Sequence, residues 1–155
     1  MLLRGPHIMQ GYWRNSEATA AALTDGWFRT GDIGHQDEDG YLYIKDRKKN
    51  MIISGGENIY AAEVERVLSQ HPAIVECALI GLNDERWGER PVAVVVCEGA
   101  EENELKQFMD GKLARFKQPR EYVFVDELPK NALGKVQHFK LKKRFEAEGR
   151  RGEGA

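Results

Sequence analysis

The chain has 155 residues, of which 41% are hydrophobic, enough for one globular domain or for one small domain and a fragment of another. Its net charge is −2, yet residues 112–151 hold 12 Lys/Arg and 5 Asp/Glu, whereas residues 1–111 hold 11 and 19. No apolar run approaches a membrane span and the N-terminus lacks the apolar core of a signal peptide, so we expect no transmembrane segment and a cytoplasmic location.

The first third of the chain is predicted to be rich in β-structure. Short apolar segments separated by turn residues occupy residues 1–44, and the turn 37–40 precedes the apolar run 41–44. A helix over residues 15–23 interrupts this region, and Ser16 is its expected N-cap. The helix has few large apolar residues, which suggests that it packs on something absent from this chain.

The remainder is predicted to form a small α+β domain, in which apolar residues at helical spacing indicate helices and apolar runs indicate buried strands. The expected elements are strands 41–45 and 51–53 around a charged turn, a helix 61–70, strands 74–80 and 92–97, a helix 102–113, a strand 122–125 and a helix 139–148. This order predicts a β-hairpin and a short three-stranded sheet packed with helices. The composition of residues 149–155 predicts a disordered end.

Neither the cysteines nor the basic end identifies a function. Cys77 and Cys97 lie within apolar strand segments, where cysteine behaves as a small hydrophobic residue, so we expect no disulfide framework and no metal site. The basic end suits phosphate-bearing ligands, but a lysine-rich terminal helix is also common as a solvated face. Nucleic-acid binding has little support, and we expect no nucleic-acid partner.

Two separate stretches can contribute to a ribose site. Asp32 follows Thr30 and Gly31 in a tight turn, where its carboxylate can accept hydrogen bonds from two vicinal hydroxyls or can simply cap its own turn. Arg47, fifteen residues later, can donate to the same ribose or to a nearby phosphate. The alternative for Arg47 and the lysines after it is a solvated hairpin turn.

Two glycine-bearing loops follow. Ser54-Gly55-Gly56-Glu57 lacks the Gly-Lys-Ser/Thr ending of a triphosphate loop, so its glycines either allow a narrow ligand close to the backbone or permit a positive φ in a plain connection. Lys135 ends the loop 128–135, and an ammonium positioned there can stabilise the negative charge of a transition state at phosphate. Without its surrounding motif, Lys135 would be read as a surface lysine.

In this order and at these spacings, the stretches resemble the C-terminal portion of AMP-forming acyl-CoA synthetases, in the superfamily that includes peptide-synthetase adenylation domains and luciferases. The resemblance extends from about Leu3 to Phe145. Its specific parts are Gly11 to Trp13, Gly26 to Asp32, Asp39 to Tyr41, Asp46 to Glu65 and Pro129 to Lys135.

The resemblance implies a ligase that works in two steps. A carboxylic acid and ATP give an acyl-adenylate and pyrophosphate, with Mg²⁺ accompanying the ATP, and a thiol then attacks to give a thioester and AMP. In this family the position of Asp32 holds the ribose hydroxyls, with that of Arg47 assisting. Lys49 matches the hinge about which the small domain rotates between the steps, and Lys135 matches a lysine that acts in adenylation and is withdrawn afterwards.

The resemblance also implies a site for CoA. The loop of Ser54, Gly55, Gly56 and Glu57 matches the lining of the tunnel for the pantetheine arm. Positions that match a surface for the nucleotide end of CoA are Trp87, Phe116, Lys117 and Arg120, and an aromatic face with cations suits adenine and phosphate. From the residues alone, Trp87 can equally be a core residue and the basic loop can be solvated.

Two positions depart from the common pattern of the family. Asp46 stands where glycine often precedes the arginine, and Ala61 stands where proline often opens the helix. Both differences affect geometry more than chemistry. The phosphate loop and the acyl pocket of the family belong to a large N-terminal domain that we expect to be missing here. The Mg²⁺ that accompanies ATP would be bound mainly by that domain.

We therefore expect residues 1–45 to be the end of the large adenylate-binding domain and residues 46–155 to be its mobile C-terminal lid. The chain would be a fragment of an acyl-CoA synthetase of fatty acid metabolism, inactive alone, whose partners are its own N-terminal domain, a carboxylic acid and CoA. The stretch 57–60 favours CoA ligases over amino-acid-activating domains. The alternative is a stand-alone, non-catalytic module that binds CoA or adenylate or docks on a separate subunit.

Overall fold

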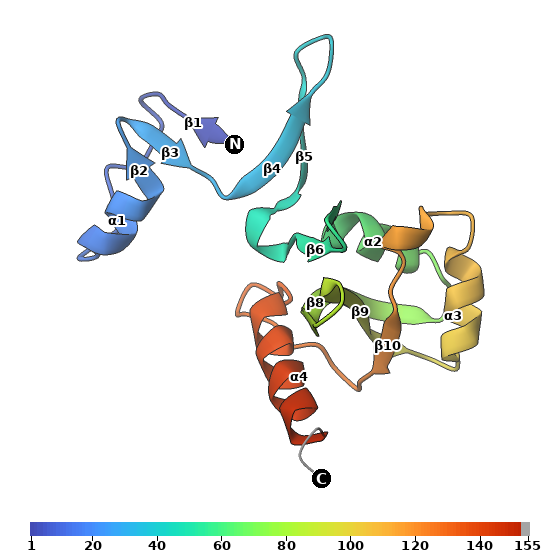
Figure 1. Ribbon diagram of the computed structural model, residues 1–155. Coiled ribbons are helices and arrows are strands. Elements are labelled where there is room, and N and C mark those ends of the chain that lie inside the picture. The colour runs from blue at the N-terminus through green and yellow to red at the C-terminus, as the bar shows by residue number, and fades with distance from the viewer. Residues whose placement is uncertain (153–155) are drawn as a thin grey trace. The chain divides into compact units, whose positions relative to one another are not determined.

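The computed structural model describes the backbone of residues 1–152 and the side chains of residues 1–148, and the chain divides into two compact units (Figure 1). Unit 1 is Met1–Lys49, and unit 2 begins at Asn50. Strand β5 (Leu42–Arg47) continues past residue 45, where the sequence suggested the end of the first region. The α+β class predicted from the sequence is confirmed by the mixed helices and sheets.

Unit 1 consists of two small antiparallel sheets and one helix. Its further elements are β1 (Leu2–Leu3), α1 (Ser16–Ala22), β2 (Leu23–Thr24), β3 (Trp27–Arg29) and β4 (Asp32–Gln36). β1 and β2 flank β3, and β4 pairs with β5 as a hairpin. The predicted cap of α1 was wrong: Asn15 is the N-cap, because its Oδ1 accepts a hydrogen bond from Ala18 N at 2.9 Å.

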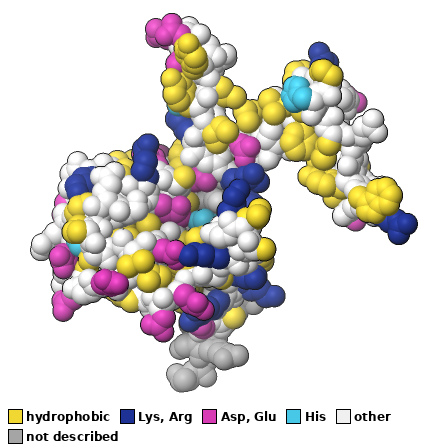
Figure 2. Space-filling model, turned by 180° about the vertical axis from the view of Figure 1, so that it is seen from behind, with side chains coloured by type: hydrophobic (Ala, Val, Ile, Leu, Met, Phe, Trp, Pro, Cys, Tyr) yellow, Lys and Arg dark blue, Asp and Glu magenta, His cyan; other side chains and the backbone are white. Residues whose placement is uncertain are grey.

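Large apolar side chains lie on the surface of unit 1 (Figure 2). Trp13 is 87% exposed and Tyr41 is 68% exposed, and the neighbouring strand residues of β5 are also exposed. None of the buried hydrophobic residues in the described chain belongs to unit 1. Its sheets are therefore held mainly by backbone hydrogen bonds and turns.

Unit 2 is built on a five-stranded sheet with β9 at its centre. Its elements are β6 (Ile52–Ser54), β7 (Glu57–Ile59), α2 (Ala61–Leu68), β8 (Ile74–Asp84), β9 (Gly88–Cys97), α3 (Glu102–Met109), β10 (Glu121–Phe124) and α4 (His138–Gly152), with a 3₁₀ turn at Arg115–Lys117. Another 3₁₀ turn, Lys48–Asn50, spans the boundary between the units. β10 is parallel to β9, whereas β8 and β6 are antiparallel to it. The sheet is thus larger than the three strands expected.

The strands expected on either side of the charged turn 46–50 do not pair with each other. β5 pairs with β4 in unit 1, whereas β6 pairs with β7 in unit 2. The sequence did not indicate β7, because that strand has only three residues and begins with Glu57 and Asn58, which rarely favour strands. Helix α3 ends at Met109 rather than at residue 113, since Asp110 has an extended backbone.

Both faces of β9 are buried, which explains its continuous apolar sequence. Ala93 and Val95 face one core, which α2 and α3 cover, and Val92 and Val94 face a second core, to which Leu141 of α4 contributes. All four strand residues are 0% exposed. Because side chains alternate along a strand, these two cores fix β9 between the two helical layers.

Polar contacts tie the layers of unit 2 together. Oε1 of Glu65 in α2 accepts a hydrogen bond from Leu79 N of β8 at 2.8 Å, and the same Oε1 lies 2.7 Å from His138 Nε2 at the start of α4.

Helix α4 runs to Gly152, beyond the expected end at 148. The rest of the predicted disordered end, residues 153–155, lies outside the described residues. No helix among the described residues is long and apolar enough to cross a bilayer.

The half-buried Cys77 and the buried Tyr122 make the stability of unit 2 depend on pH. Burial raises the pKa of the Cys77 thiol from 9.0 to about 12, with Glu65 adding to the effect. Burial, with smaller contributions from Glu102 and Asp110, raises the pKa of Tyr122 from 10.0 to about 12. A pKa raised by folding stabilises the native state below the unfolded value, and this stabilisation is lost as the pH rises through the folded value.

We therefore expect the free energy of unfolding to fall as the pH rises from about 9 to about 12. Urea unfolding measured across that interval gives the slope for the wild type and for Tyr122→Phe, which removes one of the two groups. The variant should lose less stability over this interval than the wild type. Equal slopes for the two proteins would contradict the account.

Candidate functional site

The register of the β4–β5 hairpin places Asp32 opposite Arg47. Arg47 Nε lies 2.8 Å from Asp32 Oδ1, and the Asp32 side chain is 17% exposed. The turn before Asp32 is also fixed, because Asp32 N donates to Thr30 Oγ1 at 3.0 Å and Lys48 N donates to Gly31 O at 2.8 Å. The carboxylate is therefore held in one orientation while part of it stays open to solvent.

Arg47 and Lys49 remain available to solvent in unit 1. The Arg47 side chain is 59% exposed, so its terminal nitrogens can donate to a second anion while Nε contacts Asp32. The register of the hairpin shifts at a bulge between Ile33 and Gly34, and a Cβ at Gly34 would lie 2.7 Å from Tyr43 O. Lys49 is exposed in the 3₁₀ turn that ends unit 1.

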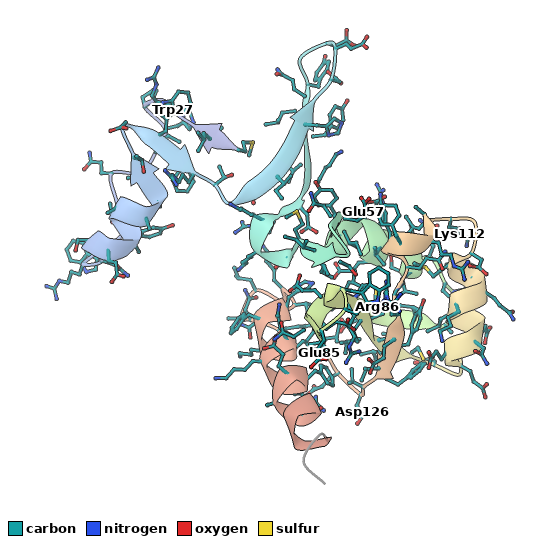
Figure 3. The ribbon with its side chains drawn as sticks, in the orientation of Figure 1. Trp27, Glu57, Glu85, Arg86, Lys112 and Asp126 are labelled. Carbon is teal, nitrogen blue, oxygen red and sulfur yellow. The ribbon has the colours of Figure 1, made fainter. Side chains whose placement is uncertain are left out.

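The loop Ser54–Glu57 is the turn of the β6–β7 hairpin. Gly55 and Gly56 have φ of 61° and 86°, which only glycine adopts readily, and this pair of positive values is typical of a tight hairpin turn. Glu57 is exposed in β7 (Figure 3), whereas the Ser54 hydroxyl is buried and has no hydrogen-bond partner among the described residues. Ser54 is 6% exposed and pairs with both Glu57 and Gly88, so the exposed backbone of this loop is that of the two glycines.

Trp87 lies directly over this glycine turn. A Cβ added to Gly55 would be 2.7 Å from Trp87 Cε3, and Gly55 N donates to Trp87 O at 2.8 Å. Arg120 lies over the indole ring, with its Cζ 4.1 Å from the ring centroid, and the Cζ of Arg86 lies 4.9 Å from the same centroid. Trp87 is half-buried, so it is not a core residue. We call Gly55, Arg86, Trp87 and Arg120 the tryptophan cluster.

The other two residues expected on this surface differ from each other. Phe116 is 45% exposed and can contact a ligand. Lys117 instead forms an ion pair with Glu63 of α2, in which its Nζ lies 2.8 Å and 2.9 Å from the two carboxylate oxygens. This ion pair holds the turn 115–117 against α2, so Lys117 has a structural contact that the sequence did not indicate.

The lysine loop is compact and organised by Asn131. Asn131 Oδ1 accepts hydrogen bonds from Leu133 N at 3.0 Å and from Lys135 N at 2.9 Å, and Asn131 N donates to Lys135 O at 2.9 Å. Gly134 has a φ of 75°, which permits the turn before the lysine. Lys135 is exposed, and its ammonium makes no ion pair within the part of the chain whose side chains are described.

The structure thus gathers the expected residues into three places: Asp32 with Arg47, the tryptophan cluster, and the lysine loop. Two contributors were not predicted as site residues, namely Arg86 (labelled in Figure 3), whose guanidinium lies near the Trp87 ring, and Asn131. Asn131 had a recognisable signal, because an asparagine shortly before a glycine often accepts hydrogen bonds from the turn that follows it. Among the described residues, no cluster of His, Cys, Asp and Glu could hold a metal ion.

Comparison with known proteins places these features in a family. Residues 63–135 match the model of the AMP-binding enzyme C-terminal domain. An indoleacetate–CoA ligase of Aromatoleum aromaticum is 56% identical over 140 residues, which are 88% of this chain and 28% of that enzyme. Relatives of this kind are CoA ligases, and the chain corresponds to their C-terminal part.

Solved structures agree with this assignment. The o-succinylbenzoate CoA synthetase of Bacillus subtilis, in complex with its acyl-adenylate intermediate, superposes with a TM-score of 0.86 and 41% identity, covering 91% of this chain and 29% of that enzyme. The same enzyme with ATP and a magnesium ion gives a TM-score of 0.84 and 40% identity, over 91% of this chain and 30% of that chain. The present chain thus spans less than a third of these relatives.

The contact between Gly55 and Trp87 can be tested with adjacent glycines. Gly55→Ala and Gly56→Ala both place a side chain at positive φ, but a methyl group meets the indole only at Gly55, since no atom lies within 4 Å of a Cβ at Gly56. We expect Gly55→Ala to shift the Trp87 indole N–H resonance in a proton–nitrogen correlation spectrum. Gly56→Ala should leave it nearly unchanged, and an equal shift in both variants would count against the cluster.

Proposed function

Because residues 63–135 form an AMP-binding enzyme C-terminal domain, we propose that this chain is the C-terminal part of an ATP-dependent, AMP-forming acyl-CoA synthetase. The observation that carries the proposal is the tryptophan cluster, where Gly55, Trp87 and Arg120 meet from three distant stretches of the sequence. The enzyme would convert a carboxylic acid, ATP and CoA into acyl-CoA, AMP and pyrophosphate by way of an acyl-adenylate.

The tryptophan cluster suits the binding of CoA. The exposed glycine turn offers backbone without side chains, which allows a narrow pantetheine arm to approach closely. The indole can stack on adenine, and Arg86 and Arg120 can pair with phosphate groups. Phe116 extends the aromatic surface, whereas Lys117 would have to leave Glu63 before it could contribute.

In unit 1, Asp32 and Arg47 suit the ribose of ATP or AMP. A carboxylate fixed by a neighbouring guanidinium can accept hydrogen bonds from the two ribose hydroxyls without first having to become ordered. Arg47 can donate to the ribose or to the phosphate beside it. The described residues supply no cluster for Mg²⁺, so in this proposal the ion is held with ATP mainly by the large N-terminal domain.

Lys135 is proposed as the catalytic lysine of the adenylation step. Attack of the carboxylate on the α-phosphate concentrates negative charge on the phosphate oxygens, and a positioned ammonium stabilises that charge in the transition state. The hydrogen bonds of Asn131 hold the Lys135 backbone, so that only its side chain must be ordered. The exposure of Lys135 suits a residue that meets the nucleotide on a second domain.

Lys49 is proposed as the hinge of the lid. The boundary between the two compact units falls between Lys49 and Asn50. In this proposal, rotation about that point moves Lys135 away after adenylation and brings the tryptophan cluster into the active site for the second step. The exposed apolar side chains of unit 1 support its assignment to the end of a larger domain, because such surfaces commonly pack against other protein.

Lys135→Ala in the complete enzyme should lower the rate of acyl-adenylate formation by about 100- to 1000-fold, because it removes one transition-state contact. Thioester formation from a supplied adenylate should be almost unaffected. Pyrophosphate exchange measures the first step and CoA consumption measures the second. Lys140→Ala removes a nearby exposed lysine of α4 as a control, and an equal loss of both half-reactions in Lys135→Ala would refute the assigned role.

Lys49→Pro should have the opposite pattern, because proline fixes φ at the proposed pivot and restricts the preceding residue. We expect slower thioester formation with a smaller effect on adenylation, measured by the same two assays. Lys49→Ala removes the charge but leaves the backbone free, so it should preserve both steps. An unchanged second step in Lys49→Pro would remove Lys49 as the hinge.

A further inference from the structure

The glycine turn of the β6–β7 hairpin has little main-chain support from the rest of the sheet. β6 pairs with β9 at a single position, Ser54 opposite Gly88, and Gly55 N adds one hydrogen bond to Trp87 O. The neighbouring Ile53 lies outside this pairing, and its amide would lack an acceptor on β9. Ile53 is 49% exposed, so its N–H can bond to water or to a side chain from β9.

Glu89 supplies that acceptor with its side chain. Glu89 Oε2 accepts a hydrogen bond from Ile53 N at 2.9 Å, so a carboxylate from β9 takes the place of a main-chain carbonyl. Its other oxygen, Oε1, accepts from Lys142 Nζ of α4 at 2.6 Å. The Glu89 side chain is 23% exposed, and the ammonium of Lys142 compensates its charge.

A glycine on the adjacent strand makes room for this carboxylate. A Cβ at Gly81 of β8 would lie 3.0 Å from Glu89 Cδ, 3.1 Å from Oε1 and 2.9 Å from Ile52 Cγ2. Gly81 is not among the glycines with positive φ, so steric space, and not backbone conformation, accounts for the lack of a side chain. The packing of β8 is thus adapted to the contact between Glu89 and β6.

We propose that Glu89 is a positioning residue for CoA, which acts by fixing β6 so that Gly55 stays against the Trp87 ring. The inference rests on the proposed CoA site, because Glu89 is assigned no contact with the ligand. Ile53 is two residues from Gly55, and Glu89 is two residues from Trp87. The hydrogen bond from Ile53 N to Glu89 therefore links the strand that carries Gly55 to the strand next to Trp87.

The sign of the effect separates this role from simple electrostatics. CoA carries several negative charges, so removing a carboxylate near its site should strengthen binding if charge alone matters. Removing Glu89 should instead weaken binding, because the glycine turn would no longer be held against the indole. Glu85→Ala is the matched control, since Glu85 is an exposed carboxylate in the turn between β8 and β9 (Figure 3) and makes no hydrogen bond or ion pair among the described residues.

The test uses this chain labelled with nitrogen-15 and titrated with CoA, following the Gly55 amide and the Trp87 indole. In Glu89→Ala we expect about tenfold faster hydrogen exchange at Ile53, the loss expected for one hydrogen bond to a charged group, and a similar loss of CoA affinity. Glu85→Ala should bind CoA at least as tightly as the wild type. Glu89→Asp should resemble Glu89→Ala, because the shorter side chain cannot reach Ile53 N.

A double variant tests whether the acceptor itself is responsible. In Glu89→Gln, the amide oxygen can accept from Ile53 N, but its NH₂ group then faces the Lys142 ammonium. Adding Lys142→Met removes that conflict while keeping an aliphatic side chain of similar length. The double variant Glu89→Gln/Lys142→Met should recover most of the exchange protection and CoA affinity, whereas Glu89→Ala/Lys142→Met should recover neither.

The outcomes separate this inference from the proposed function. If the wild type binds CoA and Glu89→Ala binds it equally well, the positioning role is overturned and the CoA site stands. If CoA perturbs neither Gly55 nor Trp87 in the wild type, the CoA site is overturned, and the positioning role is overturned with it. Weaker binding in Glu89→Ala, together with recovery in the double variant, supports both.

Discussion

The burial of β9 on both faces is the constraint on which the rest of unit 2 depends. Its alternate side chains enter two separate cores, so the helices on either side are placed relative to the same strand. The start of β9 also carries Gly88 and Glu89, which hold β6, and Pro91 O accepts from Arg120 N at 2.9 Å. The residues of the tryptophan cluster therefore lie in turns next to strands of one sheet, and hydrogen bonds to the start of β9 hold these turns.

The candidate site residues are organised by contacts within each unit. Asp32 and Arg47 face each other across one hairpin, and the tryptophan cluster belongs to one sheet. The side chain of Asn131 accepts hydrogen bonds from the backbone of the lysine loop. The geometry of each group thus depends on neighbours in the same unit. This property suits an enzyme that uses one pair of domains in two arrangements, because each group can move as a rigid body without losing its internal order.

The sequence predicted the α+β class, the main helices and the long apolar strands, because burial on one or both faces leaves a direct periodic signal. It did not predict β7 or the N-cap of α1, since three-residue strands and competing caps such as Asn15 and Ser16 leave little periodicity to recognise. The ion pair of Lys117 with Glu63 and the hydrogen bond of Glu89 to Ile53 join residues far apart in the chain, and no local pattern indicates such contacts. The motif resemblance predicted Gly55 and Trp87 as site residues, but their contact with each other is seen only in the folded structure.

If this chain carries the lid of a two-domain CoA ligase, it should complement a separately purified large domain of the same enzyme when the two are mixed. The assay measures the formation of AMP and acyl-CoA from a carboxylic acid, ATP and CoA. We expect that neither protein alone forms acyl-CoA and that the mixture does. Binding of CoA to the chain without any activity in the mixture would contradict the account and would favour a non-catalytic binding module.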